Sequence, residues 1–309
     1  MSSIKSCRRK SFLPCLTLLL IFSSASAQTK FATDPTKAII HTEDIPVFWN
    51  IFDETKPALD GDRFQKNYLD RGSAGLKGFI PMRIESGENL VRVILQDTGY
   101  YQKIRGSSLS ISSKKDTLYQ YFAGFKKIYP AAVFPDIYFV IGARNSGGTT
   151  FDGGLIIGAE MFGKEVEGFK PRLDINVVNQ VVVHELIHFQ QNYANDNSLL
   201  AQSIREGSAD FLCELVTGGH SNKPFYVYGD AHEKDLWDEF QKTMFTDDWG
   251  TWLYTTKDKS RPADLGYWMG YKVVKAYYDK AANKSQAVVD ILNIKDFRKF
   301  YAASGYGKL

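Results

Sequence analysis

Two histidines four residues apart, in the stretch VVHELIHFQQ at 182–191, constrain the fold of this chain more than any other feature. If His184 and His188 face the same way, the segment is a helix, because residues i and i+4 of a helix have Cβ atoms about 5–6 Å apart. On a strand the two residues would lie about 13 Å apart. The surrounding stretch 176–189 contains five valines, which are poor helix formers, so propensity alone also allows a strand.

The pattern His184-Glu185-x-x-His188 has a chemical interpretation. Two neutral imidazoles on one helical face can bind Zn²⁺, and the glutamate beside them can take a proton from the water that the metal holds. The motif arises by chance in about one chain in a hundred of ordinary composition. Two unconnected histidines on a polar helix face are therefore the alternative. A catalytic zinc site needs a third protein ligand and leaves one position for water.

A second helix is expected soon after the first. The turn residues NDNS at 195–198 precede LLAQSIREGSADFLCELVTGG at 199–219, where Ser198 can cap a helix and Gly218 can end it. Gly207 in the helix interior costs about 1 kcal/mol relative to alanine. Close packing against the first helix would explain that cost.

This second helix carries a candidate third ligand. Glu206 lies 18 residues after His188, and Asp210 follows one turn later on the same face. In two antiparallel helices joined by a short turn, Glu206 would reach the metal. Asp210 would accept a hydrogen bond from a ligand histidine, with His184 favoured. The alternative is a solvated acidic face, but a ligand and its supporting carboxylate at workable spacing favour a zinc site.

Helices are also expected in the first half of the chain. Residues 43–126 have the pattern of helices and turns, and the first helix opens with Thr42 and Asp44 in the manner of a capping box. KDTLYQYFAGFKKIY at 115–129 has apolar side chains at helical spacing, and Pro130 stops it.

The period of the pattern then changes. AVFPDIYFVIGA at 132–143 is rich in β-branched and aromatic residues and predicts a strand. NSGGTTFDGG at 145–154 predicts a turn-rich loop, and LIIGAEMF at 155–162 predicts a second strand. The helical pattern returns from Asp174 to the end. Two strands followed by a helix-rich second half predict an α+β protein.

The first 27 residues are expected to be a secretory signal peptide. Four cations precede the apolar run FLPCLTLLLIF at 12–22, and Ala25 and Ala27 form the A-x-A pattern of a cleavage site after Ala27. The run is too short for a membrane anchor, which needs about 20 residues. A lipoprotein signal at Cys15 is a further alternative, although Pro14 stands where such signals carry a small residue. We therefore expect an exported protein, periplasmic or extracellular.

The mature chain, 28–309, is expected to form one domain, mainly helical over 28–130 and with the strands and zinc-site helices over 131–309. Lys and Arg number 38 and Asp and Glu 35, so loss of the four signal cations leaves a net charge of −1. That balance gives no electrostatic reason to expect nucleic acid or an anionic membrane as a partner. No later stretch is apolar enough to span a membrane. Cys213, left without a partner, is expected to pack between helices.

The two halves of the candidate zinc site have a familiar arrangement. HExxH followed by ExxxD resembles the gluzincin group of zinc metallopeptidases. More closely, the chain resembles a bacterial family of predicted zinc-dependent proteases that is related to the gliding-motility lipoprotein GldB. The similar segments are DIPVFWNIFDE (44–54), YLDRGSAGLKGF (68–79), HELIHFQQ (184–191), EGSADFL (206–212) and LGYWMGYKVV (265–274).

The resemblance implies a zincin-like metallopeptidase fold, with a small sheet whose edge strand lies over a helix-rich lobe. It implies Zn²⁺ held by His184, His188 and Glu206, Glu185 as the general base, and a peptide or protein as the substrate. The segment 155–162 would supply an edge strand that pairs with the substrate backbone, or it would be an ordinary internal strand. Both possibilities are open.

Similar enzymes use a tyrosine or histidine of a later helix to hold the oxyanion that forms during hydrolysis. The stretch PADLGYWMGYKVVKAYYD fits that role, since Pro262 can open a helix and Gly270 permits close approach. Tyr267, 61 residues after Glu206, is the first choice, and Tyr271 is the second. The alternative is an aromatic stripe of the core.

Other residues carry weaker expectations. Many gluzincin aminopeptidases have a Gly-Ala-Met-Glu-Asn segment whose glutamate holds the free amine of the substrate. GAEMF at 158–162 echoes it, which makes Glu160 a candidate amine anchor. His41, His220 and His232 are expected to be surface residues rather than ligands.

A second function from another class is compatible with the same residues. GldB-like relatives are envelope lipoproteins, so the chain could be a zinc-binding envelope or assembly factor that hydrolyses nothing. The presence of Glu185 favours the enzyme, because a structural zinc site needs no base and has no open position for water.

Overall fold

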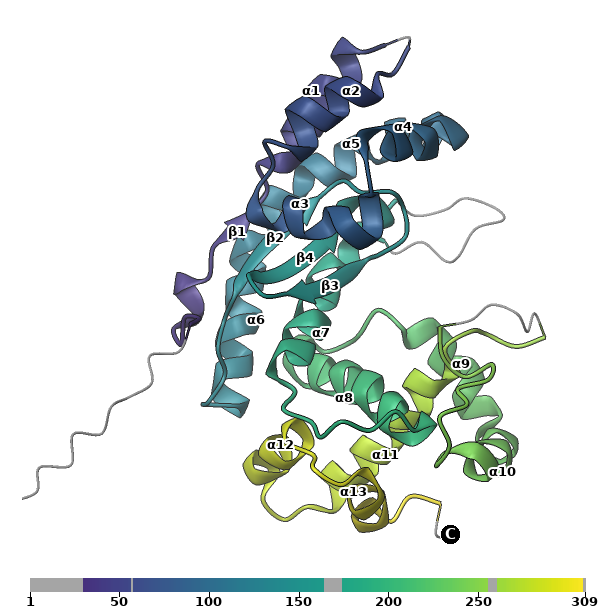
Figure 1. The fold of residues 1–309 in the computed structure, drawn as a ribbon. Coiled ribbons are helices and arrows are strands. Elements are labelled where there is room, and N and C mark those ends of the chain that lie inside the picture. Colours follow the sequence, from purple (N-terminus) through teal and green to yellow (C-terminus); the bar gives the residue numbers. More distant parts are fainter. Residues whose placement is uncertain (1–29, 57, 164–173, 255–259, 308–309) are drawn as a thin grey trace, which may run out of the picture. The chain divides into compact units, whose positions relative to one another are not determined.

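The computed structural model describes residues 30–307, except residues 57, 164–173 and 255–259 (Figure 1). The predicted signal peptide lies outside the described residues. The α-helices of the first half are α1 (Asp44–Glu54), α2 (Gly61–Phe64), α3 (Ala74–Phe79), α4 (Gly87–Gln96), α5 (Thr98–Leu109) and α6 (Lys115–Ile128). Those of the second half are α7 (Val178–Gln190), α8 (Leu199–Thr217), α9 (Lys223–Ala231), α10 (Glu233–Thr243), α11 (Leu265–Lys280), α12 (Lys284–Leu292) and α13 (Phe297–Ser304).

The described strands form one small mixed sheet. They are β1 (Ile40–His41), β2 (Asp136–Val140), β3 (Gly148–Phe151) and β4 (Gly154–Gly158), in the order β1-β2-β4-β3. β1, β2 and β4 are parallel, and β3 runs antiparallel to β4 at the edge of the sheet. The α+β class predicted from the sequence is therefore correct.

The edge strand is not the segment in which the sequence suggested one. β4, from the predicted strand 155–162, lies between β2 and β3, so the internal alternative is correct. The edge strand is β3, inside the stretch 145–154 that was expected to be a loop. Only Asp152 and Gly153 separate β3 from β4, and Asp-Gly is a strong signal for a two-residue hairpin turn. Residues 148–151 form a strand despite the glycines around them, because they pair with β4 across that turn, with Thr149 opposite Ile156.

Two predicted boundaries were also wrong. β4 ends at Gly158, and Glu160 lies in a short 3-10 turn, where its Oε1 accepts a hydrogen bond from the backbone N–H of Arg144 at 3.2 Å. The strand ends there because its ladder with β2 ends at the pair of Val140 and Gly158. At α1 the N-cap residue is Glu43, without a side-chain capping bond, and Asp44 instead accepts hydrogen bonds from Ser73.

Helices cover the sheet and connect it to the second half of the chain. α3 packs against β2 and β4, and α7 packs against β3 and β4 (Figure 1). Gly75 of α3 permits the close approach, since a Cβ on it would lie 2.2 Å from the Cβ of Tyr138. All five residues of β4 are buried, so both faces of this strand are covered.

The valine-rich segment forms a helix, as a shared metal ligand set requires. Val178, Val182 and Val183 of α7 have no exposed surface and Val181 keeps 6%. Valine in a helix costs about 0.7 kcal/mol or less relative to alanine, whereas its full burial contributes about 1.5 kcal/mol or more. Burial therefore outweighs the propensity of these residues for a strand.

Two glycines allow α8 and α11 to cross closely. A Cβ on Gly207 of α8 would lie 2.0 Å from the backbone nitrogen of Tyr271, and one on Gly270 of α11 would lie 1.7 Å from the carbonyl oxygen of Ser203. Gly207 was expected to face the first zinc-site helix, and that expectation was wrong. Its partner is α11, which begins at Leu265, three residues after the predicted start at Pro262.

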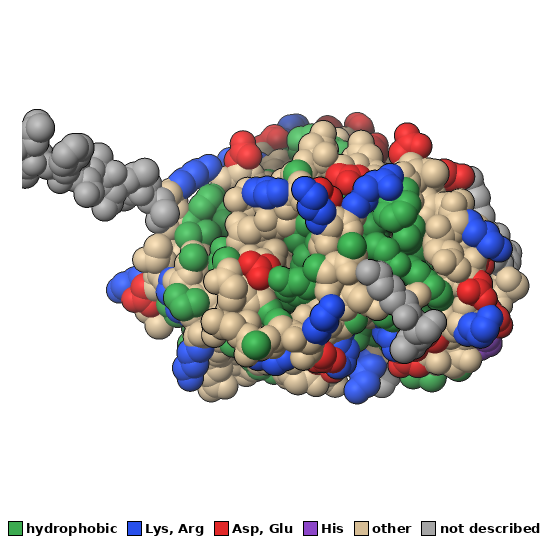
Figure 2. Space-filling model, turned by 90° about the horizontal axis from the view of Figure 1, so that it is seen from below, with side chains coloured by type: hydrophobic (Ala, Val, Ile, Leu, Met, Phe, Trp, Pro, Cys, Tyr) green, Lys and Arg blue, Asp and Glu red, His purple; other side chains and the backbone are tan. Residues whose placement is uncertain are grey.

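Residues Phe31–Leu309 form one compact unit, and a single cluster of buried apolar residues extends from Ala38 to Phe300. None of the described helices is both long and apolar enough to span a membrane. On the face drawn in Figure 2, acidic and basic side chains are interspersed among hydrophobic ones.

Candidate metal centre

Three side chains from α7 and α8 converge, as the spacing of the motifs predicts. The Nε2 atoms of His184 and His188 are 3.0 Å apart. Oε2 of Glu206 lies 3.1 Å from Nε2 of His188 and 3.4 Å from Nε2 of His184. A tetrahedral zinc site with bonds of about 2.0–2.1 Å has edges of about 3.3–3.4 Å. The three atoms, 3.0–3.4 Å apart, are thus spaced close to the edges of such a tetrahedron.

The outer nitrogens of the two rings are held by acceptors. Nδ1 of His184 lies 2.8 Å from a carboxylate oxygen of Asp210, and Nδ1 of His188 lies 3.0 Å from Oε1 of Gln191. The amide nitrogen of Gln191 donates to the carbonyl of Arg205 at 2.7 Å, which leaves its oxygen to face His188. Both Nδ1 atoms therefore carry the proton. In the neutral rings, each Nε2 then presents a lone pair to the other and to Glu206.

This convergence of lone pairs favours a cation. Burial alone would lower the pKa of the His184 ring, but the charge and hydrogen bond of Asp210 raise it well above its usual value. Burial also lowers the pKa of the His188 ring, but the charge and hydrogen bond of Glu206 outweigh burial and raise it. Burial pushes the pKa of the Glu206 carboxyl up, but His188 and His184 hold it well below its usual range. Protons or a metal ion would meet the same need, and two imidazoles with one carboxylate are a ligand set that zinc accepts.

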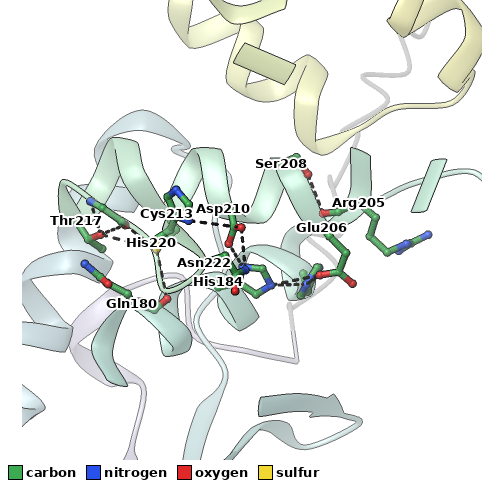
Figure 3. A network of polar contacts seen from close by, with 12 residues as sticks. Gln180, His184, Arg205, Glu206, Ser208, Asp210, Cys213, Thr217, His220 and Asn222 are labelled. Atoms are coloured by element: carbon green, nitrogen blue, oxygen red, sulfur yellow. Dashed lines mark hydrogen bonds and ion pairs between the residues drawn. The ribbon is translucent and has the colours of Figure 1, made fainter. Parts of the chain in front are cut away.

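Asp210 connects the candidate ligand His184 to the interior of the protein. Its side chain is fully buried, and its second oxygen accepts a hydrogen bond from Tyr226 at 2.7 Å. The same oxygen accepts a hydrogen bond from Asn222 at 2.9 Å, and Figure 3 shows Asp210 beside His184 and Asn222. Burial raises the pKa of Asp210, but the charge of His184 and its hydrogen bond outweigh burial and lower it. The hydrogen bond between His184 and Asp210 is therefore present as the sequence predicted. Tyr226 and Asn222 were missed, since nothing in their local sequence marks them.

Asp210→Asn is expected to weaken zinc binding by about 10–100-fold without unfolding the chain, because the ligand ring of His184 loses a charged partner. Glu206→Gln should weaken it more, since that change removes a direct bond to the metal. A chelator titration of the purified variants measures both. Glu214→Gln is the matched control on α8, because Glu214 accepts a hydrogen bond from Tyr271 and has no contact with the three ligand atoms. An affinity of Asp210→Asn equal to wild type would contradict the role of Asp210.

The histidines outside the motif differ in exposure. His220 was expected at the surface, but only 6% of it is exposed, and its ring lies 4.3 Å from that of Tyr226. The left-handed residue Gly218 turns the chain back at the end of α8, which carries His220 inward. His41 is half-buried and stacks on Tyr138, and His232 is exposed as expected.

A cavity of about 400 Å³ opens beside the three ligand atoms. It is lined by Arg83, Gly148, Thr149, Thr150, His184, Glu185, His188, Arg205, Glu206, Tyr254 and Tyr267. The edge strand β3 therefore forms part of its wall. Glu185 faces β3 closely, since a Cβ on Gly148 would lie 2.6 Å from Oε1 of Glu185. Burial raises the pKa of Glu185 above its usual value, although His188 and His184 oppose the shift. A carboxylate with a raised pKa is suited to accept a proton.

Of the two tyrosines predicted for the oxyanion, one lines the cavity. The ring of Tyr267 stacks over that of His184 at 6.3 Å, and burial raises the pKa of its hydroxyl well above the usual value. That hydroxyl stays protonated and can donate. Tyr271 is not among the lining residues, and its hydroxyl donates to Glu214 at 2.5 Å.

A third tyrosine, Tyr254, was missed. Its hydroxyl donates to Oε1 of Glu206 at 2.5 Å, so it holds the carboxylate oxygen that does not face the histidines. Its backbone has a φ of 56°, which is unusual for a residue with a side chain. Tyr254 belongs to no helix or strand, so periodicity offers no signal for it.

Two other predicted residues lie away from the cavity. Glu160 is fully buried beside Gly142 and Arg144, and burial raises its pKa to about 7. It does not line the cavity, so an amine bound there would not meet it. Cys213 is buried, and its Sγ donates to the carbonyl of Gln180 at 3.3 Å, which bridges α8 and α7. Its predicted place between helices is confirmed.

Comparison with known proteins gives one result. The family model described as "Gliding motility protein GldB" matches residues 51–308, which is most of the chain and includes the residues of the candidate centre. No curated protein and no solved structure gives a significant match.

Proposed function

The chain belongs to the family of the gliding motility protein GldB, and we propose that it is an exported zinc-dependent peptidase. The observation that carries this proposal is the convergence of two imidazoles and one carboxylate beside a glutamate that is not a ligand. Nε2 of His184, Nε2 of His188 and Oε2 of Glu206 lie 3.0–3.4 Å apart. Glu185 lines the same cavity with its carboxylate uncommitted to the three ligand atoms.

Zinc is the proposed metal. His184, His188 and Glu206 would supply three protein ligands, and a metal held by them would keep a fourth position for water, as catalytic rather than structural zinc sites do. Zinc bound there would act as a Lewis acid toward a carbonyl and would lower the pKa of a bound water.

The side chains of the cavity have separate tasks in this proposal. Glu185 takes a proton from water and passes it to the leaving amine. Tyr267 donates a hydrogen bond to the oxyanion that develops on the peptide carbonyl. Asp210 fixes the tautomer of His184. The β3 edge offers backbone groups to an extended peptide, so affinity would come from main-chain bonds with little sequence preference. An edge strand over metal-binding helices also supports a zincin-like fold as part of the proposal.

The test is turnover by the purified mature protein. The zinc-loaded chain is incubated with a mixed peptide library, and new amino termini are identified by mass spectrometry. Cleavage that depends on Glu185 supports the peptidase. Stoichiometric zinc without any cleavage would instead support a non-catalytic zinc-binding envelope factor, and absence of zinc would exclude both.

Tyr267→Phe is expected to lower kcat by about 10²–10³-fold with little change in KM, because an oxyanion donor acts mainly in the transition state. Tyr271→Phe is the matched control, since its hydroxyl bonds Glu214 outside the cavity and its loss should leave kcat unchanged. Steady-state kinetics on one library-derived peptide measures both variants. Equal effects of the two substitutions would remove Tyr267 from the mechanism.

The cell envelope is the proposed location. Membership of the GldB family and the predicted signal at residues 1–27 both support it. Cleavage after Ala27 would release a free chain, whereas lipid attachment at Cys15 would anchor it. Intact mass spectrometry of the protein from membrane and fluid fractions distinguishes the two.

A further inference from the structure

The cavity beside the candidate metal centre is lined by two arginines that form no ion pair with the part of the chain that the structure describes. Arg83 comes from the π-helical turn Ile80–Ile84 that follows α3, and Arg205 comes from α8, directly before Glu206. Both side chains are half-buried and line the cavity. Neither forms an ion pair with any residue of the described ranges. Figure 3 shows the Arg205 side chain extending beyond Glu206, away from Asp210.

Half-buried arginines elsewhere in the chain are paired. Arg144 lies 3.1 Å from Asp97, and Arg261 lies 2.8 Å from Glu239. The Arg205 guanidinium lies 5.4 Å from the centre of the Tyr193 ring, and the charge of Arg83 lowers the pKa of Glu185, but no ion pair within the described ranges neutralises either group. A half-buried guanidinium without such an ion pair gains from a carboxylate that binds to it. Arg83 and Arg205 are therefore positioned to receive an anion that comes from outside the chain.

The balance of charges that line the cavity also favours an anionic ligand. Its carboxylates are Glu185 and Glu206, which balance the two guanidinium groups. Glu206 is committed to His188 and Tyr254. A divalent metal would make the cavity net positive. The buried Glu160, once a candidate for binding a free amine, does not line it. A cationic end of a substrate could therefore pair only with Glu185 among the lining residues, and the proposed mechanism needs Glu185 as a base.

We propose that the cavity binds substrates with a carboxylate near the bond to be cut, and that Arg83 and Arg205 hold this carboxylate. This inference rests on the proposed peptidase function, and it names the class of substrate. The guanidinium fork matches the two oxygens of a carboxylate, which gives both attraction and orientation. The carboxylate is either the carboxyl terminus of the peptide or an acidic side chain.

The test measures binding separately from hydrolysis. Zinc-loaded Glu185→Gln protein is equilibrated with a mixed tetrapeptide library made in two forms, with a free carboxyl terminus and with a terminal amide. A third, amidated library lacks Asp and Glu. Retained peptides are quantified by mass spectrometry. We expect carboxylate-bearing peptides to bind about 10–100-fold more tightly than those without one.

The three libraries distinguish the two sources of the carboxylate. Preference for the free terminus over the amide identifies the terminal carboxylate. Preference for the amidated library with acidic residues over the one that lacks them identifies a side chain. Equal retention of all three libraries would overturn the inference.

Single substitutions test whether the two arginines cause the preference for carboxylate-bearing peptides. Arg83→Gln and Arg205→Gln should each remove most of it. Arg298→Gln removes the same charge from an exposed site on α13 that does not line the cavity, so it should keep the full preference. A preference that survives Arg83→Gln and Arg205→Gln together would also overturn the inference.

Failure of the inference and failure of the proposed function give different results. If the wild-type chain cleaves peptides but binds all three libraries equally, the peptidase stands and the carboxylate site is wrong. If carboxylate peptides bind through the two arginines but none is cleaved, the site stands and the peptidase is wrong.

Discussion

Replacing Glu185 by glutamine is expected to lower kcat for peptide hydrolysis by about 10²–10⁴-fold, while one zinc ion stays bound per chain. An amide cannot take a proton from water, but it has the size of the carboxylate that fits beside Gly148. The metal is retained because the three converging atoms belong to His184, His188 and Glu206. Kinetics and elemental analysis on the same preparation measure both quantities.

The control for this substitution is Glu214→Gln, which changes a half-buried glutamate of α8 outside the cavity. It should keep both zinc and activity. If Glu185→Gln cleaves peptides as fast as the wild-type chain, Glu185 is not the general base.

We expect the wild-type chain to bind one zinc ion per molecule and the His188→Ala variant to bind none. Two ligands remain, and the loss of affinity should exceed the roughly 10–100-fold cost of losing a residue that only supports a ligand. Because a ligand that binds only the folded chain stabilises it, zinc should raise the Tm of the wild-type protein but not that of the variant. Elemental analysis and thermal melts with and without zinc measure the two effects.

His232→Ala is the matched control, since His232 is exposed and its Nδ1 contacts only the backbone of its own region, at Tyr228. It should keep the metal and the zinc-dependent rise in Tm. Full zinc occupancy in His188→Ala would disprove the ligand assignment.

Local spacing in the sequence was enough to predict the central part of the site. Residues four apart share a helix face, so HExxH and ExxxD specified which side chains of α7 and α8 would meet. Caps are local as well, and Ser198 and Gly218 bound α8 as expected. The α+β class followed from a change of hydrophobic period along the chain. The shared helix faces and the caps depend on neighbours within about one or two helical turns, and the short connection between α7 and α8 makes the two helices neighbours.

Features that depend on contacts between distant segments were decided only by the tertiary structure. Gly207 faces α11 rather than α7, because the crossing of two helices is set by packing across the core. Tyr267 and Tyr271 are one helical turn apart on α11, yet one lines the cavity and the other bonds Glu214. Helical spacing makes such residues equivalent, and only the neighbouring helices distinguish them.

The residues that line the cavity are the clearest example of contacts that the sequence pattern does not predict. Arg83 lies about a hundred residues before α7, and Tyr254 lies in an irregular segment after α8, so neither has a sequence pattern that relates it to His184. The edge strand β3 was hidden in a glycine-rich stretch, because its pairing depends on β4. A motif identifies groups that act within one helix or two. The charges and the strand that would select a substrate come from segments that only the folded chain brings together.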